Sequence, residues 1–138
     1  MAQEYPGYGI YSGSSSEKKV LIDAETVYNH LLNELKISEE NIFLFGRSIG
    51  SGPATWLASI KNPGMLILMS PFTSIRAVAK HLGGPLARLL VKERFKNLEF
   101  MKDVKCPVFI IHGKKDNLIP PMQAVKLYGT TKFLIIQF

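Results

Sequence analysis

The stretch that decides the fold is Ile42-Phe-Leu-Phe-Gly-Arg-Ser-Ile-Gly-Ser-Gly-Pro53. Its first four residues are apolar on both faces, are too few for a helix and stop at Gly46, which is typical of a strand buried in a parallel sheet. Residues Ile49–Ile60 have helical composition. The segment Gly46-Arg-Ser-Ile-Gly50 is therefore a G-x-S-x-G sequence placed between a predicted strand and a predicted helix.

This G-x-S-x-G sequence predicts a nucleophilic serine. A serine hydroxyl is a poor nucleophile unless a base reaches it and an oxyanion site faces it, and a sharp strand-to-helix turn projects the side chain to meet both conditions. Ser48 is the predicted nucleophile, and the N–H of Ile49, at the positive end of the helix dipole, is a predicted oxyanion donor. The alternative is a chance glycine-serine turn, which the flanking strand and helix make less attractive.

A second polar segment, Gly113-Lys-Lys-Asp116, directly follows another apolar run, Cys106–His112. The carboxyl ends of parallel strands share one edge of the sheet, where ligands bind. In a catalytic triad whose chain order is Ser, then acid, then His, Asp116 would be the acid. It would orient and stabilise an imidazole. The alternative is an aspartate that only shapes a Lys-Asp-Asn turn.

The remaining elements complete an α/β pattern. Apolar residues in Glu17–Leu35 recur at three- and four-residue steps, as in an amphipathic helix. Helices are also predicted at Ile75–His81, Leu86–Arg94 and Met122–Tyr128, with a break at Gly83-Gly84-Pro85 between the first two. Strands are predicted at Gly64–Met69 and Lys132–Phe138. Helices that alternate with apolar strands predict a parallel sheet of about four strands with crossover helices.

Right-handed crossovers that advance in one direction place all their helices on one face of the sheet. The sequence therefore predicts a bare opposite face, which we assign to Ile42, Leu44, Leu66 and Leu68, and an unpaired edge on the first strand. Bare apolar faces and open edges favour association. We expect a dimer or another assembly that covers this face.

Composition limits the class of protein. The 138 residues fit one domain, and the single cysteine excludes an internal disulfide or a thiolate zinc site. The apolar runs are far shorter than the ~20 residues of a membrane helix, and no secretion signal precedes them, so we expect a cytoplasmic protein. The net charge of +6 is scattered along the chain, so no nucleic-acid partner is expected.

The motifs together resemble the alpha/beta hydrolases, and within them the branch of alpha/beta-hydrolase-domain proteins that act as protein depalmitoylases. Four segments carry the resemblance: Tyr5–Gly9 with Ser12, Gly13 and Glu17; Phe45–Pro53; Ser70–Ser74; and Cys106–Asp116. It implies a partial alpha/beta-hydrolase fold over residues 1–138 with Ser48 as nucleophile and Asp116 as acid. It also implies no metal or organic cofactor.

Two parts of the family pattern are not matched. The family's catalytic histidine follows the last strand, and a loop before Tyr5 supplies a second oxyanion N–H. We therefore expect a chain truncated at both ends and close to inactive. Of the three histidines present, His112 has a supporting place in the family, His81 precedes the acid and would need an unusual topology, and His30 is expected at the surface.

The resulting hypothesis is a serine hydrolase of acyl esters or thioesters, including acylated proteins, with peripheral membrane association of the longer protein. Two alternatives stay open: a non-catalytic binding or interaction module that keeps the same shape without a base, and a serine peptidase of the same superfamily. A histidine in a Gly-His context soon after Phe138 in the natural reading frame would support the enzyme, and a stop codon would support the binding module.

Overall fold

The computed structural model describes residues 16–131 and 134–137. The strands are β1 (Phe43–Arg47), β2 (Met65–Met69), β3 (Val108–Ile111) and β4 (Leu134–Gln137). They form a parallel sheet in the order β1-β2-β3-β4, so each strand pairs with its neighbours in the chain. The predicted α/β class and all four strands are confirmed. The family-like segment Tyr5–Gly13 lies outside the described residues.

Three helices lie close to their predicted positions. They are α1 (Glu17–Asn33), α2 (Ser51–Ile60) and α5 (Met122–Tyr128). The hydroxyl of Ser16 accepts a hydrogen bond from the N–H of Lys19 at 3.3 Å, so the serine run before α1 provides its N-cap. A 3₁₀ turn, η2 (Ser48–Gly50), occupies the start of the predicted Ile49–Ile60 helix.

The middle of the chain follows the prediction in outline. The element α3 (Ile75–Leu90) consists of two helical pieces separated by the predicted break at Gly84, where the backbone is not helical, and the second piece ends at Leu90 instead of Arg94. A short helix that was not predicted, α4 (Asn97–Phe100), follows it, with a 3₁₀ turn η3 (Met101–Asp103). Another 3₁₀ turn, η1 (Glu39–Asn41), precedes β1.

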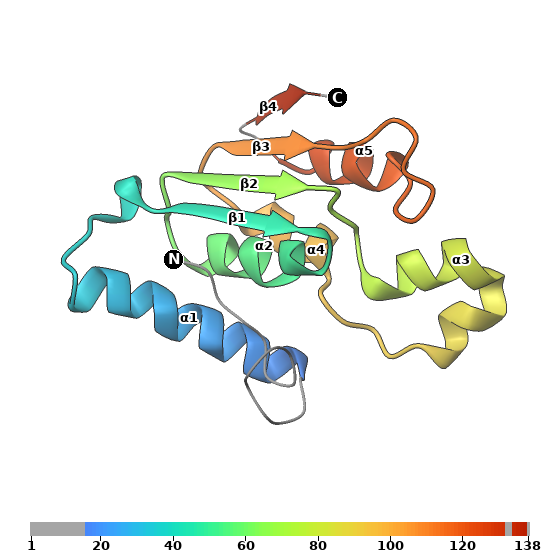
Figure 1. Cartoon of the computed structure of the whole chain (residues 1–138), viewed down its shortest axis with the longest axis horizontal. Helices are drawn as coiled ribbons and strands as arrows, with labels where there is room; N and C mark the ends of the chain where they lie inside the picture. The colour runs from blue at the N-terminus through green and yellow to red at the C-terminus, as the bar shows by residue number, and fades with distance from the viewer. Residues whose placement is uncertain (1–15, 132–133, 138) are drawn as a thin grey trace.

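The helices α1, α2, α4 and α5 lie on one side of the sheet, as predicted, and α3 lies beyond one end of the strands (Figure 1). Leu66 and Leu68 of β2 are fully buried against α2 and α5, and Ile42 packs with Tyr28 of α1 and Leu57 of α2. The main core is one cluster: Ala54, Ala58, Leu66, Leu68, Met101, Val104, Cys106, Val108, Ile110, Ala124 and Leu127.

The residues that we assigned to the bare face were wrong. Ile42, Leu66 and Leu68 are buried under the helices and Leu44 packs against the same clusters, whereas Phe43 and Phe45 are 63% and 59% exposed. In an extended strand successive side chains point to opposite faces. All four residues from Ile42 to Phe45 are hydrophobic. The sequence therefore has no alternation of polar and apolar residues that could show which side chains face the helices.

Candidate active site

The turn from β1 to α2 holds the serine of the G-x-S-x-G sequence. Ser48 directly follows the last residue of β1 and has a φ of 49°, a left-handed conformation that non-glycine residues rarely adopt. Such a conformation costs roughly 1–3 kcal/mol and is concentrated at functional sites. The strand–turn–helix context predicted for Ser48 is confirmed.

Close packing explains the small residues around this serine. A Cβ at Gly46 would lie 2.6 Å from the carbonyl oxygen of Gly50 and 2.8 Å from both Ala54 Cβ and Ser51 Cα. Backbone atoms of the turn and of the first turn of α2 therefore occupy the space a side chain would need. Only glycine lets the helix return so close to the strand that leads to Ser48.

The predicted acid occupies a rigid turn after β3. Oδ1 of Asp116 accepts hydrogen bonds from the N–H groups of Ile119 at 2.9 Å and Leu118 at 3.0 Å. The hydrogen bond from Ile119 is the main cause of a pKa for Asp116 below its ordinary value, partial burial opposes it, and the hydroxyl of Ser70 and the N–H of Leu118 lower it further. The carboxylate is therefore held ionised and in one orientation.

The sheet register brings these groups to one edge. Arg47, Met69 and Ile111 are paired across β1, β2 and β3, so Ser48, Ser70 and His112 each come directly after the same level of the sheet. Adjacent strands lie about 4.8 Å apart, so β1 and β3 are separated by roughly 10 Å. That spacing leaves room for one imidazole ring between a side chain after β1 and a carboxylate in the loop after β3.

Ser70 is a site residue that the sequence reasoning missed in this role. It follows β2, has a φ of 46°, and its N–H donates to the carbonyl of Ile111 at 2.8 Å. Its hydroxyl also helps to lower the pKa of Asp116. A usable signal existed, because a polar residue directly after the strand between the nucleophile strand and the acid strand must lie at the same edge of the sheet.

Asn97 is a second missed residue, and it braces the helix behind the serine. Its side chain is fully buried, and its Nδ2 donates to Ser51 Oγ at 3.1 Å and to the carbonyl of Phe72 at 3.0 Å. Asn97 thereby ties the first residue of α2 to the segment after β2. No spacing in the sequence indicates a contact between residues this far apart.

Two of the three histidines considered as a base place Nε2 close to a backbone carbonyl oxygen. Nε2 of His112 lies 2.6 Å from the carbonyl of Ile119 and 3.7 Å from Asp116 Oδ2, and the side chain is buried. Nε2 of His81, on α3, lies 3.0 Å from the carbonyl of Asn117. His30 lies in the last turn of α1 and is exposed, as expected.

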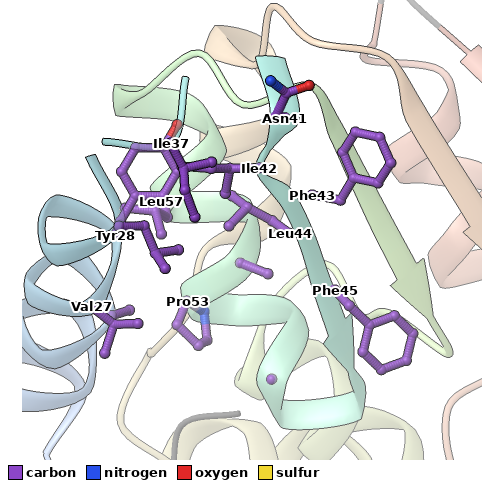
Figure 2. Close-up of a pocket in the computed structure, with 14 residues that line it drawn as sticks. Val27, Tyr28, Ile37, Asn41, Ile42, Phe43, Leu44, Phe45, Pro53 and Leu57 are labelled. Atoms are coloured by element: carbon purple, nitrogen blue, oxygen red, sulfur yellow. The ribbon is translucent and has the colours of Figure 1, made fainter. Parts of the chain in front are cut away.

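An apolar hollow of about 570 Å³ lies along the edge of β1 that is unpaired in the described part of the chain (Figure 2). Figure 2 shows Ile42 and Leu44 directed toward the helices, and Phe43 and Phe45 directed away from them. Gly50, at the turn into α2, lines the hollow, whereas Ser48 and Asp116 do not. The hollow therefore adjoins the serine turn without containing the reactive groups.

Three further features bear on the site and its surroundings. Within residues 16–131 and 134–137, no group of three or more His, Cys, Asp or Glu side chains is placed to hold a metal ion. No helix in the described part of the chain is long and apolar enough to cross a bilayer. Ile49, the predicted oxyanion donor, lies in η2 and is 48% exposed.

The curated proteins similar to this chain include several alpha/beta hydrolase domain-containing proteins. The chain is 34% identical over 125 residues to the one named aho-3 of Caenorhabditis elegans, covering 91% of this chain and 37% of that protein. It is 33% identical to protein 17C of Homo sapiens, with 91% and 37% covered. The chain thus spans little more than a third of these relatives. No family model matches the sequence.

Solved structures with a similar fold are also hydrolases. An alpha-beta hydrolase from Vibrio vulnificus matches with a TM-score of 0.76 at 21% identity, over 97% of this chain and 54% of that one. A monoacylglycerol lipase from Paleococcus ferrophilus matches with a TM-score of 0.64 at 20% identity, over 97% and 71%. By these comparisons the chain is a homologue of alpha/beta hydrolase domain-containing proteins over about a third of their length, and it has part of the alpha/beta-hydrolase fold.

Proposed function

We propose that this chain carries the nucleophile and the acid of a serine hydrolase that acts on acyl esters or thioesters. The observation that supports this most directly is Ser48 itself, a serine with a φ of 49° on the turn between the strand β1 and the helix α2. A strained serine turn of this kind exposes its hydroxyl at the edge of an α/β sheet, where a substrate carbonyl can approach it.

In the proposed reaction, Ser48 Oγ attacks the substrate carbonyl carbon and its proton passes to a base. The N–H of Ile49 donates to the oxygen that becomes negative, in a position favoured by the positive end of α2. When the C–O or C–S bond breaks, the leaving alcohol or thiol takes the proton from the base. Water then attacks the acyl-Ser48 ester, returns a proton to Ser48 and releases the carboxylic acid.

We propose that the base is a histidine supplied by sequence outside these 138 residues. The histidines His81 and His112 each place Nε2 against a backbone carbonyl, and the chain spans only 37% of its first relatives. Asp116 is suited to orient an imidazole, because two backbone N–H groups engage Oδ1 and leave acceptor capacity on Oδ2. We expect the 138-residue chain alone to turn over slowly, since loss of a triad member costs about 10⁴ or more in kcat.

The proposed substrate class is the acyl ester or thioester, including acyl groups attached to proteins. The similarity to alpha/beta hydrolase domain-containing proteins over 91% of this chain supports it, together with the depalmitoylase-like motifs of the sequence. The test is hydrolysis of matched acyl thioester, oxyester and anilide substrates by the longer gene product that contains these residues. Hydrolysis of the thioester and oxyester should fall at least ~10³-fold in Ser48→Ala.

A matched control separates this loss from damage to the fold. Ser59 lies on the same helix α2, and its hydroxyl donates to the carbonyl of Trp56 at 2.6 Å, so Ser59→Ala should leave turnover unchanged. Faster cleavage of the anilide than of the esters would favour the serine-peptidase alternative. Equal turnover in Ser48→Ala and the parent would contradict the proposal.

A further inference from the structure

The second half of α3 exposes a row of leucines. Leu86, Leu89 and Leu90 are 69%, 75% and 80% exposed, and Leu82, which lies just before this half, is 58% exposed. The three largest of these values belong to residues after the kink at Gly84, where φ is 71° and ψ is −167°. In contrast, Ile75 and Val78 in the first half of α3 pack against the buried side chains of Phe72 and Phe95. The kink therefore turns the leucines of the second half away from the core.

Hydrogen bonds hold α3 at its first turn, at His81 and at the residue after its last turn. Ser74 Oγ accepts from the N–H of Ala77 at 3.2 Å, which caps the start of the helix. Arg76 Nε donates to the carbonyl of Val91 at 2.9 Å, so the residue after the leucines is tied back to the first turn. Nε2 of His81 contacts the loop of the predicted acid at Asn117. The leucine row is thus presented by a braced hairpin of helix.

The charges around this row are almost all positive. Residues 75–96 contain six Lys or Arg residues and one acidic residue, Glu93. Glu93 is engaged by the N–H of Arg76 at 3.4 Å. Lys80, Lys92 and Arg94 are exposed. Six basic residues against one acidic residue give this segment a formal net charge of +5, so the positive charge is more concentrated here than the scattered distribution that we described from the sequence.

The leucine row lies at the functional end of the sheet. Figure 1 shows α3 beyond the carboxyl ends of β1, β2 and β3, on the side from which the loop after β3 also projects. Ser48 follows β1 and Asp116 lies in that loop. A surface that binds α3 would therefore face the edge of the sheet where Ser48 and Asp116 lie.

We propose that the kinked second half of α3 docks on an anionic lipid surface, with its leucines in the acyl-chain boundary and the flanking lysines and arginines at the headgroups. Exposed leucines beside clustered basic residues are the combination that interfacial helices use. Each basic residue near an anionic membrane strengthens binding by roughly fivefold. A second copy of this chain fits less well, because two copies joined here would bring two strongly positive segments together.

The test is sedimentation of the protein with phosphatidylcholine vesicles, prepared with and without phosphatidylserine. The variant Leu86→Ser/Leu89→Ser/Leu90→Ser should weaken binding at least tenfold, because it removes apolar side chains from the buried face of the contact. Since all three positions are highly exposed, the urea midpoint should stay within the error of the parent. The matched control, Ile22→Ser/Leu35→Ser on and after α1, replaces side chains that are 50% and 52% exposed and should bind as the parent does.

A charge variant tests the headgroup part of the proposal. Lys80→Glu/Lys92→Glu should abolish the difference between vesicles with and without phosphatidylserine, and added salt should do the same to the parent. Three outcomes would overturn the proposal. In the first, the parent protein does not bind the anionic vesicles. In the second, it binds equally well to vesicles with and without phosphatidylserine, and in the third, the triple leucine variant binds as tightly as the parent. If instead the triple variant loses self-association in light scattering and the parent ignores vesicles, the row is an interface between copies. Hydrolysis is not measured, so the result is independent of the proposed reaction.

Discussion

The serine turn can be tested by adding one methyl group to its tightest point. In Gly46→Ala the new Cβ would meet a carbonyl oxygen at 2.6 Å and two carbon atoms at 2.8 Å, where ordinary contacts begin near 3.4 Å. Two of these atoms belong to the backbone of the turn into α2, and they cannot rotate away as a flexible side chain could. The substitution must therefore push α2 away from β1 by several tenths of an ångström.

The expected loss follows from two opposing effects. Overpacking of this kind costs about 1–3 kcal/mol, whereas alanine restricts the unfolded chain and returns about 0.4–1 kcal/mol. We expect Gly46→Ala to lose about 2 kcal/mol of unfolding free energy, which lowers a urea midpoint by roughly 1 M for a domain of this size. The displaced turn should also react more slowly at Ser48.

The control is Gly113→Ala, at the start of the acid loop, where the nearest atom to an added Cβ is Asp116 Cβ at 3.9 Å. This variant should stay within about 0.5 kcal/mol of the parent. Urea unfolding followed by far-UV circular dichroism measures both. Equal midpoints for Gly46→Ala and Gly113→Ala would show that the space at Gly46 can hold a methyl group.

Three other predictions concern the acid, the brace and the bare face. Because hydrogen bonds lower the pKa of Asp116 in the folded state, its stabilisation is complete above the unfolded pKa of about 3.9 and is lost as pH falls through the lower folded value. Asp116→Asn should therefore be about 1 kcal/mol less stable than the parent in urea at neutral pH, and a gap that persists below the folded pKa would contradict this origin. Asn97→Ala should lower the unfolding free energy by about 2 kcal/mol, because it leaves Ser51 Oγ and the carbonyl of Phe72 without their buried donor; unchanged thermal unfolding would count against the brace. We also propose that Phe43 and Phe45, exposed on the face opposite the helices, drive association of this 138-residue chain; Phe43→Ser/Phe45→Ser should shift the mass measured by light scattering toward the monomer, and a parent that is monomeric at all concentrations would argue against it.

The sequence predicted the sheet well because each strand is a short apolar run between polar or turn-forming residues. The same property gives no information on which face of the sheet the helices cover, because Ile42 and Phe43 are both hydrophobic and either could be buried under a helix. The actual choice depends on how α1 and α2 pack, and Tyr28 and Leu57 enclose Ile42 only once the chain has folded.

The middle of the chain was less predictable for a different reason. Gly83-Gly-Pro85 indicates a break between two helical pieces, and the positive φ of Gly84 makes that break, but the short helix α4 that follows has no comparable signal in the sequence. At the site, Ser48 and Asp116 were predictable because their motifs are local. Asn97 was not, because its partners Ser51 and Phe72 are distant in sequence.

Covalent labelling with a fluorophosphonate shows whether Ser48 is the nucleophile. The longer gene product that contains these residues should gain one phosphonate, detected by intact mass and located on Ser48 by peptide mapping. Ser48→Ala should lose the label, and Ser59→Ala, whose serine is on the same helix, should keep it. Labelling of Ser48→Ala at the rate of the parent would contradict the account.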